Sequence, residues 1–195
     1  MSRPAPPDVG ALRFAVRPTP GPRFLAAVVL TTALAGAVGA LVPEGGALGA
    51  VGGVVGLLLV HGGLLGAGLV EQHRVHDAAL VLGPTAGRAR PYVLPWSQLD
   101  PGSLQVHRRA NLVGSRYGAV GTSRNLRTAV YSTSAVSVVG PAPLGGSGSV
   151  RWLMGVRDPE PLARAVERAM VDAGLPAQGA AERALAAPVV EQRRR

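Results

Sequence analysis

The sequence predicts a membrane α-helical hairpin joined to a small α+β, mainly β, domain. Three observations support this prediction: two long stretches without charge, short alternating runs after them, and one amphipathic helical pattern near the end. The uncharged stretches are residues 24–42 and 47–70, and the alternating runs begin at residue 72. A chain of 195 residues has room for one domain of ordinary size beside such a hairpin.

The composition argues against several classes of function. Cysteine is absent, so we expect no disulfide framework, no thiolate zinc site and no cysteine nucleophile. The formal net charge of +9 is spread along the chain, and neither a basic helix nor an aromatic stacking surface accompanies it. We therefore do not expect nucleic-acid binding.

Residues 1–23 precede the first uncharged stretch. Their first ten residues are rich in proline and polar side chains, which predicts disorder. Leu12, Phe14 and Val16 then alternate with other residues, which is a weak strand signal. Such a strand either adds to a later sheet or only leads into the bilayer.

Residues 24–42 and 47–70 are each long enough for a transmembrane helix. At about 1.5 Å per residue the first spans roughly 28 Å, close to the hydrocarbon thickness, and the second crosses with some tilt. Arginines lie on both outer flanks, whereas the connection holds only Glu44. By the positive-inside rule we expect a multi-pass protein of the cell membrane with both termini in the cytoplasm.

A secretory signal peptide is the competing interpretation of residues 24–42, because Val38 and Ala40 fit a small-residue cleavage site. The apolar run is longer than the usual length of about 7 to 15 residues. A second apolar stretch also follows directly. We therefore favour an uncleaved helix.

Glycines recur at four-residue spacing in the hairpin, which allows helix backbones to approach closely. Two interpretations follow. The two helices of the hairpin pack on each other through these glycines, or one face of the hairpin binds a second copy of the chain. The predicted helix-packing residues are Gly45, Gly49, Gly53, Gly62 and Gly66.

Residues 72–174 are predicted to form a cytoplasmic domain of short strands closed by one helix. The strand candidates are residues 77–82, 88–96, 103–108, 129–133, 134–140 and 150–156, with a loose Gly/Ser/Arg loop or hairpin over 110–128.

The closing helix has a clear start and end. Asp158 is a favourable N-cap and Pro159 suits the first helical position. Gly174 supplies the C-cap, and Pro176 prevents continuation. An apolar stripe at helical spacing predicts packing on the sheet: Leu162, Ala165, Val166, Ala169, Met170 and Ala173. Residues 175–195 are expected to be a disordered tail, with at most a short helix around 180–186.

Two segments resemble a known family. "YVLPWSQL" at residues 92–99 and "RWLMGVRDPEPLARAVERAM" at residues 151–170 are similar to passages of bacterial pleckstrin-homology-like (PH-like) domains. With the preceding hairpin, the chain resembles small actinobacterial membrane proteins that carry two N-terminal transmembrane helices and such a domain. The resemblance implies a PH-like β-sandwich or barrel with one C-terminal capping helix, acting as an interaction module.

Histidines are the main candidates for chemistry. His61 lies within the second uncharged stretch. Its candidate roles are a proton-relay group or a haem ligand. We favour a third interpretation, a neutral imidazole that is hydrogen-bonded across the hairpin. His73 and His76 have the spacing of helical metal ligands, but a polar turn at the membrane is the preferred interpretation. We expect no metal and no cofactor.

Catalysis is not expected, because no nucleophile elbow, P-loop or dinucleotide-binding motif occurs. A buried acid/base cluster around Trp96 and Trp152 would change this expectation.

Arginines are concentrated around the loose stretch. If this region faces the bilayer they contact anionic lipid, and otherwise they belong to a solvated loop. These residues are Arg108, Arg109, Arg116, Arg124 and Arg127.

We therefore expect an integral membrane protein that presents a cytoplasmic PH-like domain to a protein partner, with anionic lipid as a second contact. The alternative is an accessory or assembly subunit of a larger membrane complex, acting through the Gly-rich hairpin.

Overall fold

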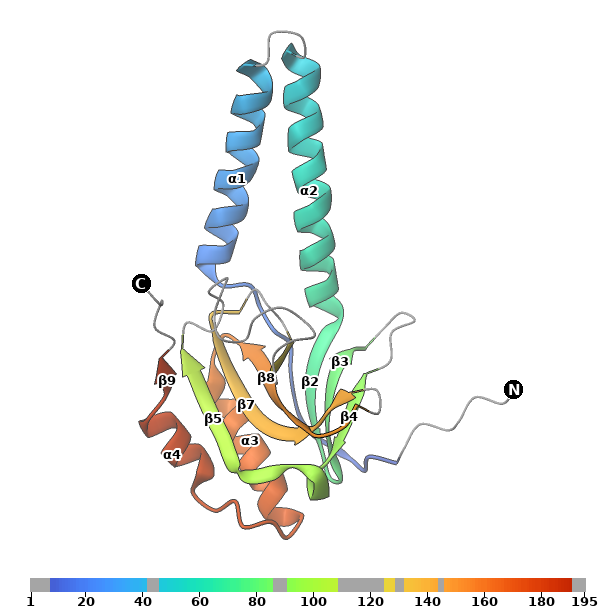
Figure 1. Cartoon of the computed structure of the whole chain (residues 1–195), viewed down its shortest axis with the longest axis vertical. Coiled ribbons are helices and arrows are strands. Elements are labelled where there is room, and N and C mark those ends of the chain that lie inside the picture. Colours follow the sequence, from blue (N-terminus) through green and yellow to red (C-terminus); the bar gives the residue numbers. More distant parts are fainter. Residues whose placement is uncertain are drawn as a thin grey trace, which may run out of the picture.

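A computed structural model describes residues 8–41, 46–85, 91–108, 125–128, 132–143 and 146–190. It consists of a long two-helix hairpin that projects from a β-rich domain (Figure 1). The hairpin is formed by α1 (Pro22–Leu41) and α2 (Gly46–Val70), which match the predicted stretches to within two residues. Val42, where the first stretch was predicted to end, lies outside the described residues.

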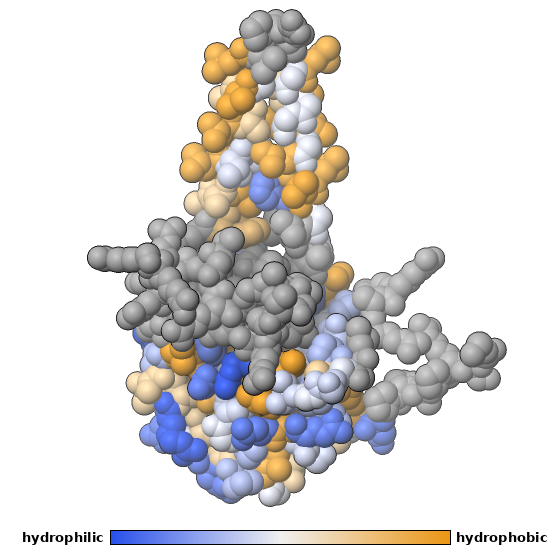
Figure 2. Space-filling model, viewed as in Figure 1, coloured by the Kyte–Doolittle hydropathy of each residue, from blue (hydrophilic) through white to orange (hydrophobic). Residues whose placement is uncertain are grey.

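Apolar side chains cover the outside of the hairpin (Figure 2). Leu41, Leu48 and Leu59 are 81%, 86% and 72% exposed. The windows Phe24–Leu41 and Gly46–Gly63 are long and apolar enough to cross a membrane, and neither is buried inside the protein. These helices are therefore not the core helices of a globular domain, in which such side chains would be covered.

A four-stranded antiparallel sheet joins the segments before and after the hairpin. Its order is β1-β2-β3-β4, and the strands are β1 (Leu12–Val16), β2 (Glu71–His76), β3 (Ala79–Pro84) and β4 (Tyr92–Pro95). β1 pairs with β2, with Val16 opposite His73. The weak strand signal at Leu12 therefore belongs to this sheet.

A five-stranded sheet packs against the first, with the order β6-β8-β7-β5-β9. A 3₁₀ turn, η1 (Trp96–Gln98), leads from β4 into β5. The two sheets do not join into a closed barrel within the part of the chain that the structure describes. The strands are β5 (Asp100–Arg108), β6 (Asn125–Thr128), β7 (Ser134–Pro141), β8 (Ser149–Val156) and β9 (Val189–Val190).

The closing helix α3 (Pro159–Asp172) has the predicted ends. Asp158 accepts a hydrogen bond from the backbone N–H of Glu160, and Gly174 follows the helix at φ 81°, a conformation that favours glycine. Its apolar face packs on the core between the sheets. The larger core side chains include Trp96, Trp152, Leu80, Leu82, Met154, Leu162 and Met170.

The prediction of a disordered tail is wrong for residues 175–190. α4 (Ala180–Ala186) packs on the core through Ala181, and β9 adds in parallel to the end of β5. Because alanine buries little area, this helix has a weak apolar signature in the sequence. The short helix considered at residues 180–186 is therefore present, as a second helix after the predicted capping helix.

The domain boundaries also change. The folded domain includes β1 from residues 1–23 and α4 with β9 from residues 175–195, besides the strands of residues 72–174. The hairpin is thus an insertion between its first two strands. Of the loose stretch 110–128, only β6 lies within the described residues.

Candidate membrane anchor and juxtamembrane site

Glycines form the closest part of the seam between α1 and α2. A Cβ on Gly39 would lie 2.6 Å from the Cα and N atoms of Ala50 and from the carbonyl oxygen of Gly49. A Cβ on Gly53 would lie 3.3 Å from the carbonyl oxygen of Ala35. A residue larger than glycine at position 39 would prevent this close approach of the two backbones. The approach gives dispersion contacts between the helices.

The predicted helix-packing glycines fall into three groups. Gly49 and Gly53 lie in the seam, as self-packing of the hairpin requires. Gly62 and Gly66 have open space at their Cβ positions. Gly45 lies outside the described residues.

The junction between α2 and the domain has no linker. α2 ends at Val70 and β2 begins at Glu71. The Val70 carbonyl accepts hydrogen bonds from the backbone N–H and the hydroxyl of Thr85, at 2.8 Å and 3.1 Å. The end of α2 is therefore fixed to the end of β3.

The segment before α1 is held by the start of β7. The hydroxyl of Ser132 donates to the carbonyl of Thr19 at 3.4 Å. Gly21 is buried, and a Cβ there would lie 3.1 Å from the methyl of Thr133. Both ends of the hairpin are thus attached to the domain.

Four strands of the second sheet meet at this end of the domain. Arg108 pairs with Ser134 on one side and Val190 on the other, and Ser134 pairs with Val156. We call this line of Val190, Arg108, Ser134 and Val156 the juxtamembrane row. Figure 1 shows the arrowheads of β5 and β8 pointing toward the hairpin.

The predicted lipid-contacting arginines are placed only in part. Arg108 is exposed at the end of β5, in the juxtamembrane row. Arg127 belongs to β6, where it pairs with Leu153 of β8. Arg109, Arg116 and Arg124 lie outside the described residues.

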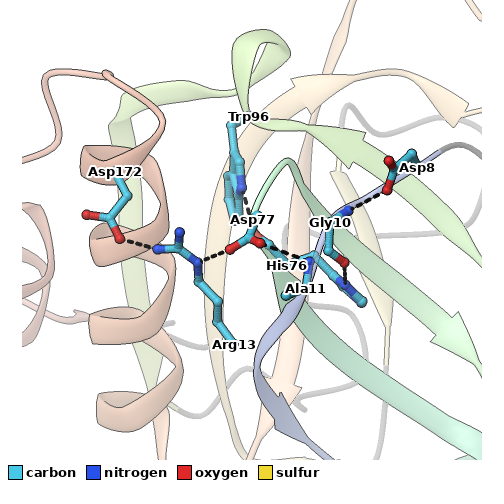
Figure 3. A network of polar contacts seen from close by, with 8 residues as sticks. All are labelled: Asp8, Gly10, Ala11, Arg13, His76, Asp77, Trp96 and Asp172. Carbon is cyan, nitrogen blue, oxygen red and sulfur yellow. Dashed lines mark hydrogen bonds and ion pairs between the residues drawn. The ribbon is translucent and has the colours of Figure 1, made fainter.

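A polar network ties β1 to the far end of the domain (Figure 3). Arg13 donates to the carboxylates of Asp77, in the β2–β3 turn, and Asp172, at the end of α3. Asp77 also accepts the backbone N–H of Ala11 at 2.9 Å. The hydrogen bond from Arg13 and that from the Ala11 N–H hold the pKa of Asp77 below its usual value.

His73 and His76 lie on a strand, so the expectation of a polar turn is corrected. Residues three apart on a strand point to opposite faces, which separates the two imidazoles. His73 is buried, and its Nε2 lies 3.0 Å from the carbonyl of Gly155, to which it donates. Burial lowers the pKa of His73 to about 4, so the ring is neutral at physiological pH.

His61 is partly buried on α2. Its Nδ1 is buried and has no hydrogen-bond partner, so the expected bond across the hairpin is not made through this atom. The hydroxyl of Thr32 on α1 is also buried without a partner. Among the residues that the structure describes, no group of three His, Asp or Glu side chains could hold a metal ion.

A second buried polar cluster lies on the face of the five-stranded sheet that is turned away from the core. The Ser137 hydroxyl lies 2.7 Å from Nε2 of His107 and accepts from Arg151 at 3.0 Å. Arg151 also donates to the carbonyl of Ser103 at 2.9 Å. His107 and Ser137 are 1% and 0% exposed, so this serine and histidine are closed to a substrate.

The tryptophans around which an acid/base cluster was considered belong to the core. The indole N–H of Trp96 donates to the carbonyl of His76, and that of Trp152 to the carbonyl of Pro141, both at 3.0 Å. The ring of Tyr92 packs against Trp152, with 5.0 Å between ring centroids. The contacts of the two N–H groups are thus with the backbone.

Sequence reasoning missed the role of Glu167, an acidic residue of α3. Its carboxylate accepts the backbone N–H groups of Gly179 and Ala181, at 2.5 Å and 2.9 Å. These groups lie at the start of α4, where a negative charge is favourable. The sequence does not show this contact, because Glu167 belongs to α3 and is 12 and 14 residues away from the N–H groups that it binds.

Comparisons with protein-family models, with curated proteins and with solved structures found no match to this chain. The class that the described residues define is therefore architectural: a two-helix apolar hairpin inserted between the first two strands of a β-rich domain.

Proposed function

We propose that this chain is an integral membrane protein of the cell membrane that presents a cytoplasmic domain to a protein partner. α1 and α2 cross the bilayer, the β-rich domain is of the PH-like kind, and the protein is not an enzyme. The observation that carries the proposal is the absence of a linker between α2 and β2. A domain joined in this way is presented at a fixed orientation and height above the bilayer.

The pairing of β1 with β2 supports a two-span topology. These strands flank the hairpin and belong to one sheet. If the hairpin crosses the bilayer twice, both flanks emerge on the same side, as the sheet requires. A single crossing would put the two strands on opposite sides.

The same pairing argues against a cleaved signal peptide. Cleavage after Ala40 would remove β1 and with it the contacts of Arg13 with Asp77 and Asp172. Phe14 and Val16, which pack against the core, would also be lost. An uncleaved first helix keeps the sheet intact.

The distribution of charge favours the cytoplasmic side for the domain. Arginines flank the outer ends of the hairpin, and Glu44 is the charged residue of its connection. Positive residues next to transmembrane helices are retained in the cytoplasm.

Site-specific crosslinking tests the proposed partner contact. The chain has no native cysteine, so single photoreactive labels can be attached at exposed domain positions such as Ser97 or Ser147, and at Leu48 on the hairpin. We expect a discrete adduct from domain positions in living cells. Adducts from the hairpin alone would contradict the proposal.

The second candidate function is assembly into a larger membrane complex through the hairpin. The observation in its favour is that Gly52, Gly56 and Gly63 have open space at their Cβ positions, away from α1. Such a face can accept another helix, from a partner or a second copy. Loss of a crosslinked complex in Gly56→Leu, with Ala26→Leu at an exposed position of α1 as a control, would favour this function.

A further inference from the structure

Three arginines surround the juxtamembrane row. Arg108 is in the row, and Arg157 follows Val156 of the row directly. Arg17 lies on the segment between β1 and α1, before Thr19, which Ser132 contacts. Residue register thus brings side chains from three distant parts of the sequence to the end of the domain where the hairpin begins.

The backbone around these arginines is fixed. Pro18 and Gly21, which follow Arg17, are buried, and Gly21 packs on Thr133. Arg108 is held between β7 and β9. The arginines are therefore set at a constant distance from the start of α1 at Pro22.

The side chains of Arg17, Arg108 and Arg157 are free to bind a ligand. All three residues are exposed, and none has a hydrogen bond or ion pair with another residue in the described part of the chain. By contrast, Arg13 and Arg164 are neutralised by carboxylates.

The two acidic side chains that follow Arg157 most closely in the sequence have other partners. Asp158, next to Arg157, accepts the backbone N–H of Glu160 at 3.2 Å. Glu160 in turn accepts from Arg164 at 2.9 Å. Neither carboxylate forms an ion pair with Arg157 among the residues that the structure describes.

We propose that Arg17, Arg108 and Arg157 bind the phosphate headgroups of anionic lipids in the leaflet next to the domain. This inference rests on the proposed function, because it requires that the hairpin is inserted. A guanidinium group can form two parallel hydrogen bonds with a phosphate group. This interaction is strongest where water is partly excluded. The three arginines reach the headgroup layer together because the hairpin holds them there.

Native mass spectrometry of the full chain in detergent tests the inference. Phosphatidylglycerol and phosphatidylcholine are titrated separately, and lipids that remain bound are counted. Each juxtamembrane arginine is worth roughly fivefold in affinity. We expect wild type to retain phosphatidylglycerol preferentially, and R17Q/R108Q/R157Q to lose at least about tenfold in affinity for it.

A matched triple variant is the control. R164Q/R168Q/R183Q removes the same charge from exposed positions on α3 and α4. It should retain the wild-type preference for phosphatidylglycerol. An equal loss in both variants, or equal retention of both lipids by wild type, would overturn the inference.

Two further arms separate the sources of failure. If inorganic phosphate competes at the same concentration as the lipid, the ligand is a free anion and the lipid assignment is wrong. Alkaline carbonate extraction of cell membranes tests insertion itself. Release of the chain by carbonate contradicts the proposed function, whereas retention without lipid preference contradicts only this inference.

Discussion

Arg13, the second residue of β1, forms an ion pair with Asp77, which follows the whole hairpin in the sequence. The pair joins β1 to the β2–β3 turn, and the same guanidinium reaches Asp172 at the end of α3. The segments before and after the hairpin are therefore parts of one folded unit.

Arg13→Gln should lower the midpoint temperature of thermal unfolding of the full chain. It should also make β1 more susceptible to cleavage by a protease. The variant removes both carboxylate contacts and leaves Asp77 with only the Ala11 N–H among these partners. The difference from wild type should shrink in high salt, because the pair is exposed and screened.

Arg168→Gln, at an exposed position of α3, is the control and should leave the midpoint unchanged.

The same ion pair should depend on pH. Because the pKa of Asp77 is lowered in the fold, the ionised carboxylate stabilises the folded state above the usual value of 3.8. This stabilisation is lost as pH falls through the lowered value. An Arg13→Gln effect that persists below that range would count against the ion pair.

His73 should make the domain sensitive to mild acid. Its pKa is about 4 in the fold and 6.5 in a free chain, so the unfolded state takes up the proton first. Stability is full above pH 6.5 and falls as pH drops toward 4, by up to about 3 kcal/mol.

Chemical denaturation at several pH values from 7 to about 4.5 checks this dependence. His73→Gln cannot titrate and retains a donor for the carbonyl of Gly155. Its free energy of unfolding should vary less with pH in this range. Equal pH slopes for the variant and wild type would show that His73 is not responsible.

Glu167→Ala should destabilise α4 and the strand after it. The substitution leaves the N–H groups of Gly179 and Ala181 without their carboxylate, at a cost of about 1 kcal/mol. Hydrogen exchange should increase at residues 179–190 more than elsewhere. Arg168→Ala, at an exposed position of α3, should not produce this pattern.

The hairpin seam should accept an engineered disulfide. The Cβ of Ala35 lies 3.7 Å from the ideal Cβ position of Gly53, close to the usual separation of about 3.8 Å in a disulfide. Ala35→Cys/Gly53→Cys should therefore form an intramolecular bond on mild oxidation, detected by protease cleavage and gel mobility.

Adding Gly39→Leu should reduce the yield of this disulfide, because the side chain collides with the backbone of Ala50 and Gly49. Gly52→Leu, where the Cβ position is open, should not reduce it. A disulfide that forms equally well in the Gly39 variant would show that the seam is elsewhere.

Local chemistry predicted the helices well. The uncharged stretches gave α1 and α2, and the Asp158 cap with Gly174 gave the ends of α3. In each case the signal lies within the element itself: length without charge, or capping residues at fixed offsets.

The elements that were missed, or only weakly indicated, depend on distant partners. β2 was interpreted as a polar turn because His73, not an apolar residue, occupies a buried position on it, satisfied by Gly155. α4 depends on Glu167 and on small alanines, and β1 on pairing across the hairpin. The juxtamembrane row was likewise invisible, since strand register brings Arg108 and Arg157 together.

Labelling of single cysteines with a membrane-impermeant maleimide tests the central claim most directly. Cysteine replaces Asp8 before β1, Ser147 in the domain, or Glu44 in the connection, one at a time in an otherwise cysteine-free chain. In intact cells we predict that only residue 44 is labelled, and that residues 8 and 147 react only after the membrane is permeabilised. Labelling of residues 8 and 147 from opposite sides, or of all three from the same side, would contradict the inserted hairpin.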